Sequence, residues 1–422
     1  MENKLKIGII GLGTVGCGVV KVLNQYDDIE IIGAAVKNKN KLREVEVNYV
    51  TDNVYDLINN PEINVIVEVA GGLGMLEPLK CAIRNKKHVV TANKQLLACH
   101  GAELFDLAKE NNTIILYEAA VAGGIPIILP VKMSLQANKF NSVAGILNGT
   151  TNYILTKMEE ENLSYDECLK KAQELGYAET DPTGDVEGFD AMYKIAILAN
   201  IVFNKRIVVD KIYREGITNI SALDMQIADE LGYKIKLIAQ AKKYYKKNDD
   251  KSLDIRVHPM LVSKKHPLSE IKNSLNAVSL TGFPVDEVMF VGPGAGQYPT
   301  SSSVVGDILN IKAEYQRKDE ILPMTRCHHS EYAEQIGIED TYNCYYIRIN
   351  ASNNPGTIGK IGTSCGKYDI NLSCIIQRGL NSDGTATIIV LTEVAYEKNI
   401  NLMIDDLQKD NEIKVVNKIR VM

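Results

Sequence analysis

The sequence contains no apolar run of the roughly 18 residues that a membrane-spanning helix requires. It also lacks a positively charged segment followed by an apolar one before the first expected strand, which is the pattern of a secretory signal. These two absences exclude a membrane protein and a secreted one. We therefore expect a cytoplasmic protein that does not bind a membrane.

The eight cysteines include no C-x-x-C pair and no regular framework, so neither a disulfide-rich domain nor a zinc ribbon is indicated. Cys327-His328-His329 carries residue types that bind metals. No second cluster of cysteine or histidine lies near it in the sequence, and we expect a structural or surface role for these residues.

The chain also lacks an excess of positive charge, because acidic residues outnumber basic ones: the net charge is −6 and the isoelectric point about 5.7. This balance argues against a nucleic acid or an anionic membrane as the main partner. The one dense basic run, residues 242–247, is followed by Asp249-Asp250 and is typical of a solvated surface turn. At 422 residues the chain is long enough for two or three domains.

What the sequence does contain begins with a glycine-rich motif after an apolar run at residues 4–10. In Gly11-Leu12-Gly13-Thr14-Val15-Gly16 the first glycine permits a tight turn and the second admits a pyrophosphate close to the backbone. The third lets the following helix pack on the strand. Between a strand and a helix this motif predicts dinucleotide binding, with a glycine turn that binds nothing as the alternative.

Further strands are expected at residues 29–36, 65–69, 88–90 and 113–117, with helices between them, which predicts a Rossmann-like, doubly wound α/β domain. An acidic residue commonly ends the second strand in proteins that bind NAD. Here Lys37 stands in that region, which favours NADP and leaves NAD open. Ala70 follows the third strand and Lys94 the fourth, at the sheet edge where ligands bind.

The stretch from Gly176 to Lys194 carries a dense group of acidic residues that could take part in catalysis or binding. Its five carboxylates are followed by one lysine: Glu179, Asp181, Asp185, Glu187, Asp190 and then Lys194. Asp190 and Lys194 are four residues apart on a helix expected at 186–203, and no other charge lies between Gly188 and Phe203, so both lie on one face of an otherwise apolar or neutral segment. Either they form an ordinary helical ion pair, or the helix faces a cleft where buried charges are used.

The chain resembles homoserine dehydrogenase, and the resemblance covers residues 1 to about 315. The motifs that carry it occur in the order found in that family: GLGTVG at Gly11–Gly16, TANK at Thr91–Lys94, YEAAVAGGIP at Tyr117–Pro126, GILNGTTNYIL at Gly145–Leu155, GYAETDPTGDVEGFDAMYK at Gly176–Lys194, and GPGAG at Gly292–Gly296.

The resemblance implies reversible NAD(P)-dependent reduction of L-aspartate 4-semialdehyde to L-homoserine. It makes Lys194 the acid–base group, with Asp190 orienting it, and Glu179 the group that binds the substrate ammonium. It places Lys94 between cofactor and substrate, and Gly176 and Gly296 beside the cofactor. We expect Asp190 to keep Lys194 charged, and Asp181, Asp185 and Glu187 to serve the N-terminus of the helix.

The resemblance also implies a site for sodium or another monovalent cation in the turn at Tyr117–Pro126. Its ligands would be Glu118 and the backbone carbonyls of Val121, Gly123 and Ile125. Oxygen ligands suit a hard cation. From the residues alone, this segment predicts only a glycine turn.

The expected domains are residues 1–140 with about 296–316 for the cofactor, 141–295 for substrate and dimerisation in an α+β fold, and 342–422 at the C-terminus. The last has a strand–helix–strand–strand–helix–strand order, which is ferredoxin-like. With Asn353-Asn354-Pro355-Gly356 at its first turn it resembles an ACT regulatory module. That resemblance implies an amino-acid effector such as threonine and a homodimer or homotetramer, with a purely structural dimerisation role as the alternative.

Two other functions fit parts of the pattern. One is a dehydrogenase for a different small amino-acid aldehyde or hydroxy acid, although none of the six histidines lies in the acidic stretch to serve as a base. The other is a catalytically silent amino-acid sensor. The joint presence of Lys94, Glu179, Asp190 and Lys194 favours the enzyme.

Overall fold

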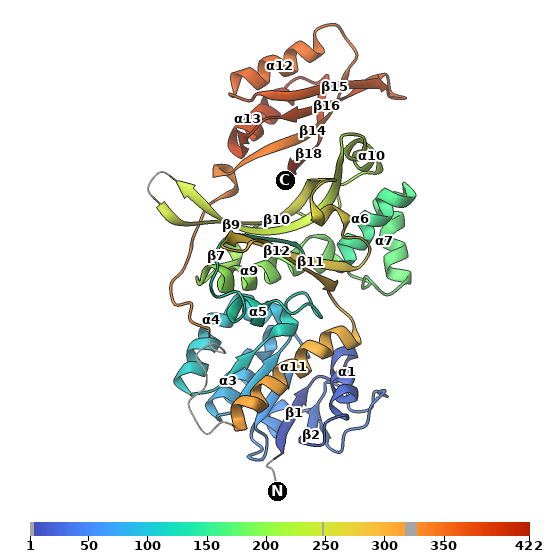
Figure 1. Ribbon diagram of the computed structural model, residues 1–422. Helices are drawn as coiled ribbons and strands as arrows, with labels where there is room; N and C mark the ends of the chain where they lie inside the picture. Colours follow the sequence, from blue (N-terminus) through green and yellow to red (C-terminus); the bar gives the residue numbers. More distant parts are fainter. Residues whose placement is uncertain (1–3, 247–248, 317–326) are drawn as a thin grey trace.

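The computed structural model describes residues 4–246, 249–316 and 327–422, which form three stacked parts (Figure 1). The first part holds a six-stranded sheet in the order β3-β2-β1-β4-β5-β6, with every neighbouring pair parallel. Its strands are β1 (Leu5–Ile10), β2 (Ile29–Ala35), β3 (Val50–Thr51), β4 (Val65–Glu68), β5 (His88–Thr91) and β6 (Ile115–Leu116). The doubly wound sheet predicted from the sequence is confirmed, with the short β3 as an addition.

Helices cover both faces of this parallel sheet, so its strands are buried on both sides and read as continuous apolar runs. One face packs against α1 (Thr14–Leu23) and α11 (Gln297–Gln316). The other packs against α2 (Val54–Ile58), α3 (Leu76–Arg84) and α4 (Lys94–Glu110). Helix α11 comes from the far end of the second part of the chain and lies across the first domain (Figure 1).

The middle part is an antiparallel sheet in the order β12-β11-β7-β9-β10. These strands are β7 (Lys139–Ile146), β9 (Tyr233–Lys246), β10 (Asp249–Ser263), β11 (Leu275–Phe283) and β12 (Asp286–Pro293), and the short β8 (Tyr213–Arg214) and β13 (Glu334–Gln335) pair with β10. Its helices are α5 (Ile128–Lys132), α6 (Gly149–Glu161), α7 (Tyr165–Glu174), α8 (Thr183–Val186), α9 (Phe189–Phe203) and α10 (Ala222–Glu230).

The basic run at residues 242–247 was interpreted as a surface turn, and this is wrong for its first part. Lys242 lies within β9 and pairs with Asp254 of β10 at 3.6 Å. Lys247 lies outside the described residues, as do residues 317–326. The lysines of β9 obscure the alternation of apolar and polar residues that would predict a strand. One of them, Lys236, is fully buried, and its ammonium donates to the Ile271 carbonyl at 2.7 Å.

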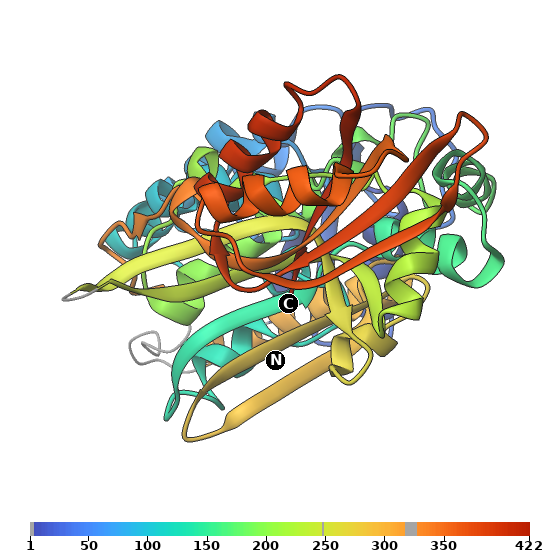
Figure 2. The ribbon, with the colours of Figure 1, turned by 90° about the horizontal axis from the view of Figure 1, so that it is seen from above.

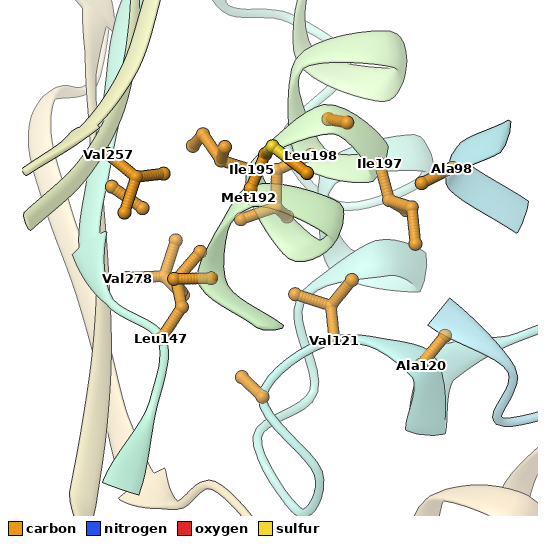
Figure 3. Packing of buried hydrophobic residues seen from close by; sticks show 14 of the residues in the cluster. Ala98, Ala120, Val121, Leu147, Met192, Ile195, Ile197, Leu198, Val257 and Val278 are labelled. Atoms are coloured by element: carbon orange, nitrogen blue, oxygen red, sulfur yellow. The ribbon is translucent and has the colours of Figure 1, made fainter. Parts of the chain in front are cut away.

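Helix α9 packs between the middle sheet and the helices of the first part of the chain. Figure 3 shows Met192, Ile195 and Leu198 of this helix lying between Val257 and Val278 of the middle sheet and Val121 of the first domain. The helix predicted for residues 186–203 is α9, but it begins at Phe189 rather than Val186, because Gly188 has a φ of +80° and separates α9 from α8. A left-handed residue ends one helix and redirects the chain into the next. The break leaves Asp190 in the first turn of α9.

The C-terminal part has the predicted ferredoxin-like order, with strands arranged β18-β14-β16-β15. Its elements are β14 (Tyr342–Ser352), α12 (Thr357–Lys367), β15 (Leu372–Leu380), β16 (Thr385–Thr392), β17 (Ala395–Tyr396), α13 (Glu397–Leu407) and β18 (Ile413–Val421). Helices α12 and α13 cover the outer face of the sheet, which faces the viewer in Figure 2.

The C-terminal sheet also continues into the middle one, because β18 pairs with β10 in parallel through Met260–Arg420 and Leu261–Val421. Successive side chains of β14 point to opposite faces. Tyr345 and Ile347 pack under α12 and α13, whereas Tyr346 and Arg348 face α10 of the middle part. The resulting sheet has twelve strands in the described chain.

Candidate active site

The glycine motif forms a cradle at the end of β1. Gly11 has a φ of +101°, and a side chain there would lie 2.8 Å from the backbone nitrogen of Ala70. A side chain at Gly16 would meet the Gly11 carbonyl at 2.0 Å, whereas one at Gly13 would meet nothing within 4 Å. Each glycine therefore has the geometry that its predicted task requires. The N-terminus of α1 carries no side-chain cap, so its N–H groups are open to an anion such as pyrophosphate.

A cleft of about 800 Å³ opens beside this cradle. Gly11, Leu12, Gly13, Val69 and Ala70 line one side of it; the basic loop after β2, which includes Lys37, Lys39 and Arg43, lines the other. Arg43 donates to the carbonyls of Lys41 and Asn38, which closes the loop on itself. Strand β2 ends without a carboxylate. The cleft therefore has room for a dinucleotide, and its basic side carries one carboxylate, Asp52, which pairs with Lys39 at 3.2 Å.

Three charged side chains meet at the opposite end of the same sheet edge. The Asp190 carboxylate accepts from Lys194 at 2.7 Å through Oδ2, and Lys94 Nζ lies 2.7 Å from Oδ1. Lys194 Nζ also donates to the Leu147 carbonyl at 2.8 Å. Asp190 and Lys194 are 7% exposed, whereas the Lys94 side chain is 44% exposed. The helical pair predicted from the spacing is confirmed, and Lys94 joins it from α4.

Burial and charge act against each other in this cluster. Burial would raise the pKa of Asp190, but the two ammonium groups hold it well below its ordinary range. Asp190 raises the pKa of Lys94. Burial lowers the pKa of Lys194, and Lys94 lowers it further against the opposing effect of Asp190. Asp190 thus acts in the expected direction, because it favours the charged form of Lys194, but burial and the Lys94 charge leave the pKa of Lys194 below that of an ordinary lysine.

Asn148 links this cluster to the rest of the acidic stretch. Its side-chain oxygen caps α6 by accepting from Thr151 N at 2.8 Å, and its Nδ2 donates to Asp190 at 2.9 Å and to Asp185 at 2.7 Å. The sequence analysis missed Asn148, although its position before a helix is a capping signal. It also assigned Asp185 to a helix N-terminus alone. Asp185 lies in the first turn of α8, but its side chain is turned toward the cluster.

Of the remaining predicted site residues, the structure links Glu179 to this cluster. Glu179 is exposed, and its charge acts on Lys94. Gly176 and Gly296 have φ values of +76° and +121°. Asp181 accepts from Thr183 N at 3.1 Å at the start of α8. Glu187 instead lies beside Thr218 and Arg214, away from the lysines.

The Glu118 turn is held by hydrogen bonds to α5 and by packing on the segment Gly292–Gly296. The carboxylate accepts from three backbone N–H groups at the start of α5, those of Ile127, Ile128 and Leu129, at 2.6 to 2.8 Å. The Gly123 carbonyl accepts from Ser303 at 2.7 Å. A side chain at Gly123 would meet the Gly294 carbonyl at 2.4 Å, so this turn packs tightly on the GPGAG segment. The Glu118 carboxylate is therefore held at the start of α5, and both it and the Gly123 carbonyl keep a further acceptor position beside these bonds.

Cys327 lies 2.8 Å from the Tyr117 hydroxyl and 3.4 Å from Lys132 Nζ, and His329 is buried against Phe105. Within the described ranges, no three side chains of histidine, cysteine, aspartate or glutamate come together as a metal site. No helix among the same residues has the length and apolar character to cross a membrane.

Sequence profiles match two regions of the chain. One is described as homoserine dehydrogenase and matches residues 126–309, and the other as homoserine dehydrogenase, NAD binding domain, and matches residues 11–118. A homoserine dehydrogenase of Synechocystis sp. is 40% identical, with 99% of each chain covered. That of Bacillus subtilis is 37% identical, with 99% of this chain and 97% of the relative covered.

Solved structures agree with the sequence relatives. A homoserine dehydrogenase from Thiobacillus denitrificans has a TM-score of 0.91 at 34% identity, with 99% of this chain and 98% of that one covered. A hyperthermophilic archaeal homoserine dehydrogenase in complex with NADPH has a TM-score of 0.63 at 27% identity and covers 75% of this chain and all of its own.

Proposed function

Because the chain belongs to the homoserine dehydrogenase family, we propose that Lys194 transfers the proton when it interconverts L-aspartate 4-semialdehyde and L-homoserine. The chain is an NAD(P)-dependent oxidoreductase acting on a CH–OH group, as its profiles and relatives establish. The observation that carries the proposal is the buried carboxylate between two lysines, at the sheet edge that also holds the cofactor cleft.

The bound nicotinamide supplies or accepts the hydride. As hydride reaches the aldehyde carbon, negative charge develops on the carbonyl oxygen. The Lys194 ammonium stabilises this oxygen and donates its proton to it. Its lowered pKa makes it a stronger acid than an ordinary lysine, and in the reverse direction the neutral amine accepts the proton from the homoserine hydroxyl.

Asp190 positions both lysines, because each of its oxygens lies 2.7 Å from one ammonium. We assign Lys94 to the junction between cofactor and substrate, since it is the more exposed of the two lysines. Glu179 binds the substrate ammonium. Its exposed carboxylate lies on the Lys94 side of the cluster, where opposite charge attracts the ammonium.

We assign NADP as the preferred cofactor, with NAD as the alternative. Lys37 and its basic neighbours line the cleft where NAD-specific proteins place an acidic residue. A ribose phosphate forms charge-assisted hydrogen bonds with such cations. The cradle made by Gly11–Gly16 and Ala70 holds the pyrophosphate, and Gly176 and Gly296 approach the cofactor through their left-handed backbones.

A monovalent cation such as sodium is the second proposed ligand. The carboxylate of Glu118 and the backbone carbonyls of Val121, Gly123 and Ile125 are its ligands, and the three N–H groups of α5 hold that carboxylate in place. Gly123 has a left-handed backbone, with a φ of +53°. This conformation changes the direction of the neighbouring peptide carbonyls, so they need not alternate as in a strand.

We further propose a cytoplasmic homodimer or homotetramer. Strands β12 and β15 are the two edges of the twelve-stranded sheet, so each presents unpaired backbone groups. Leu380 of β15 and Val291 of β12 are 64% and 47% exposed. Exposed apolar edges of this kind are commonly covered by a second copy.

The direct test of the activity is an absorbance assay. Purified protein with L-homoserine is expected to reduce NADP⁺ at alkaline pH. Because a charge-assisted contact contributes about 1.5–3 kcal/mol, kcat/KM with NADP⁺ should exceed that with NAD⁺ about tenfold or more. Absence of reduced cofactor with both would reject the activity, and equal kcat/KM values would reject the NADP preference alone.

The C-terminal domain is proposed as an ACT-like sensor of threonine. Asn353, at the loop before α12, accepts from Gln377 of the edge strand β15 at 2.8 Å, and Gly356 has a φ of +95°. L-Threonine is expected to inhibit the enzyme, and Asn353→Ala to require about tenfold more of it, because one hydrogen-bonding group is lost. Identical inhibition curves for the two proteins would place the sensor elsewhere or leave the domain a structural role.

A further inference from the structure

A buried carboxylate that the proposed chemistry does not use lies between the cofactor cleft and the lysine cluster. Glu68 ends β4 and is 0% exposed. Its Oε1 accepts from the backbone nitrogens of Ala70 at 3.0 Å and Gly71 at 2.7 Å, and its Oε2 accepts from the Thr91 hydroxyl at 2.6 Å. The two N–H groups can only donate, so they favour the ionised carboxylate, whereas burial raises the pKa of Glu68.

The first pair of bonds holds the turn after β4. Ala70 and Val69 line the cofactor cleft, and the Ala70 backbone is the group that a side chain at Gly11 would strike. Gly71 and Gly72 both have left-handed backbones, with φ values of +78° and +84°. A turn with two such glycines has many alternative conformations. The carboxylate of Glu68 therefore selects the one that leaves room for the cofactor.

The second bond leads to Lys94. Thr91 Oγ1 accepts from Asn93 N at 3.0 Å, and the Asn93 side chain caps α4 by accepting from Leu96 N at 3.1 Å. Asn93 Nδ2 also donates to the Gly72 carbonyl at 2.9 Å, which ties this segment back to the turn. Lys94 is the first residue of α4. Thr91 and Asn93 are 0% and 4% exposed, so the connection is shielded from water.

We propose that Glu68 is a positioning residue that holds the cofactor-facing turn with one oxygen and the Thr91–Asn93 support of Lys94 with the other. Glu68 touches neither substrate nor reacting atoms. It sets the distance between the cofactor and Lys94. The inference rests on the proposed roles of the cleft and of Lys94. Burying an ionised carboxylate is costly unless hydrogen bonds satisfy its charge. A buried glutamate at this position is therefore consistent with a role in positioning its donors.

Two variants separate the two functions of the carboxylate. Glu68→Ala removes both arms, so we expect NADPH binding, followed by fluorescence titration without substrate, to weaken about tenfold, and kcat to fall as well. Thr91→Val keeps the shape and removes only the arm toward Lys94. It should lower kcat about tenfold while the Kd for NADPH changes by less than about twofold. Glu68→Gln retains an oxygen for the two N–H groups and should largely restore NADPH binding.

The matched control is Glu62→Ala, which removes an exposed carboxylate from the same domain and should match the wild type. The proposal is overturned if Glu68→Ala behaves like this control. It is also overturned if Thr91→Val weakens NADPH binding and kcat together, as Glu68→Ala does. The NADPH titration needs no homoserine. If the proposed activity fails, the effect of Glu68 on the cofactor-facing turn can therefore still be measured.

Discussion

Lys194→Ala is expected to lower kcat for homoserine oxidation about a thousandfold while the Kd for NADPH stays near that of the wild type. General acid–base groups contribute about 10²- to 10⁴-fold to catalysis. The lysine lies at the Asp190 end of the site, away from the glycine cradle. Asp190 keeps Lys94 and Asn148 as partners, so the variant is not left with an uncompensated carboxylate. Steady-state rates and NADPH fluorescence measure the two effects.

Lys170→Ala is the control, because Lys170 is an exposed helical lysine of the same domain. Its kcat should equal that of the wild type. If Lys194→Ala retains a kcat within a few fold of the wild type, another group transfers the proton. If it loses NADPH binding as well, the lysine belongs to the cofactor site.

The pH profile provides a second reading of the same group. In homoserine oxidation the neutral amine accepts the proton, so the rate should rise with pH through the pKa of Lys194. Burial lowers this pKa, so the midpoint should lie below the ordinary lysine value of 10.5. Asp190 opposes the lowering, so Asp190→Asn should move the midpoint to still lower pH. A midpoint that stays unchanged in Asp190→Asn would assign the titration to a different group.

Asp224→Ala is expected to destabilise the docking of the C-terminal domain by about 3–5 kcal/mol, the usual cost of removing one partner of a buried ion pair. Asp224 of α10 is 0% exposed and accepts from Arg348 Nε at 2.7 Å and the Tyr346 hydroxyl at 3.0 Å, both of β14. Asn417 of β18 adds a bond at 3.0 Å. The substitution leaves the Arg348 charge buried without its carboxylate. Calorimetry should show a lower unfolding temperature.

Glu230→Ala is the matched control, since Glu230 also lies on α10 and also pairs with an arginine of the C-terminal domain, Arg378. That pair is exposed, so its loss should cost at most about 1 kcal/mol. Adding Arg348→Met to Asp224→Ala should recover part of the stability, because no unpaired charge remains. Equal unfolding temperatures for Asp224→Ala and Glu230→Ala would show that the buried network does not hold the domain.

Much of the fold could be predicted because its signals are local. The Gly11–Gly16 motif, the apolar parallel strands and the strand–helix order of the C-terminal domain each depend on a few consecutive residues. Strand β9 could not be predicted, since its lysines are polar by sequence, and only tertiary partners such as Asp254 and the Ile271 carbonyl satisfy their charges within the sheet. The break at Gly188 was missed for a similar reason, because periodicity continues through one left-handed residue.

The cofactor motif and the pairing of Asp190 with Lys194 follow from residue spacing, because backbone geometry sets which residues share a turn or a helical face, and the family follows from the order of the motifs along the chain. Only the tertiary structure brought Lys94, Asn148 and Asp185 to that pair and connected Glu68 to both the cofactor turn and Lys94. It also decided the direction of the Lys194 pKa. Those outcomes depend on which distant segments pack together and how much water they exclude, and neither quantity is encoded in residue spacing.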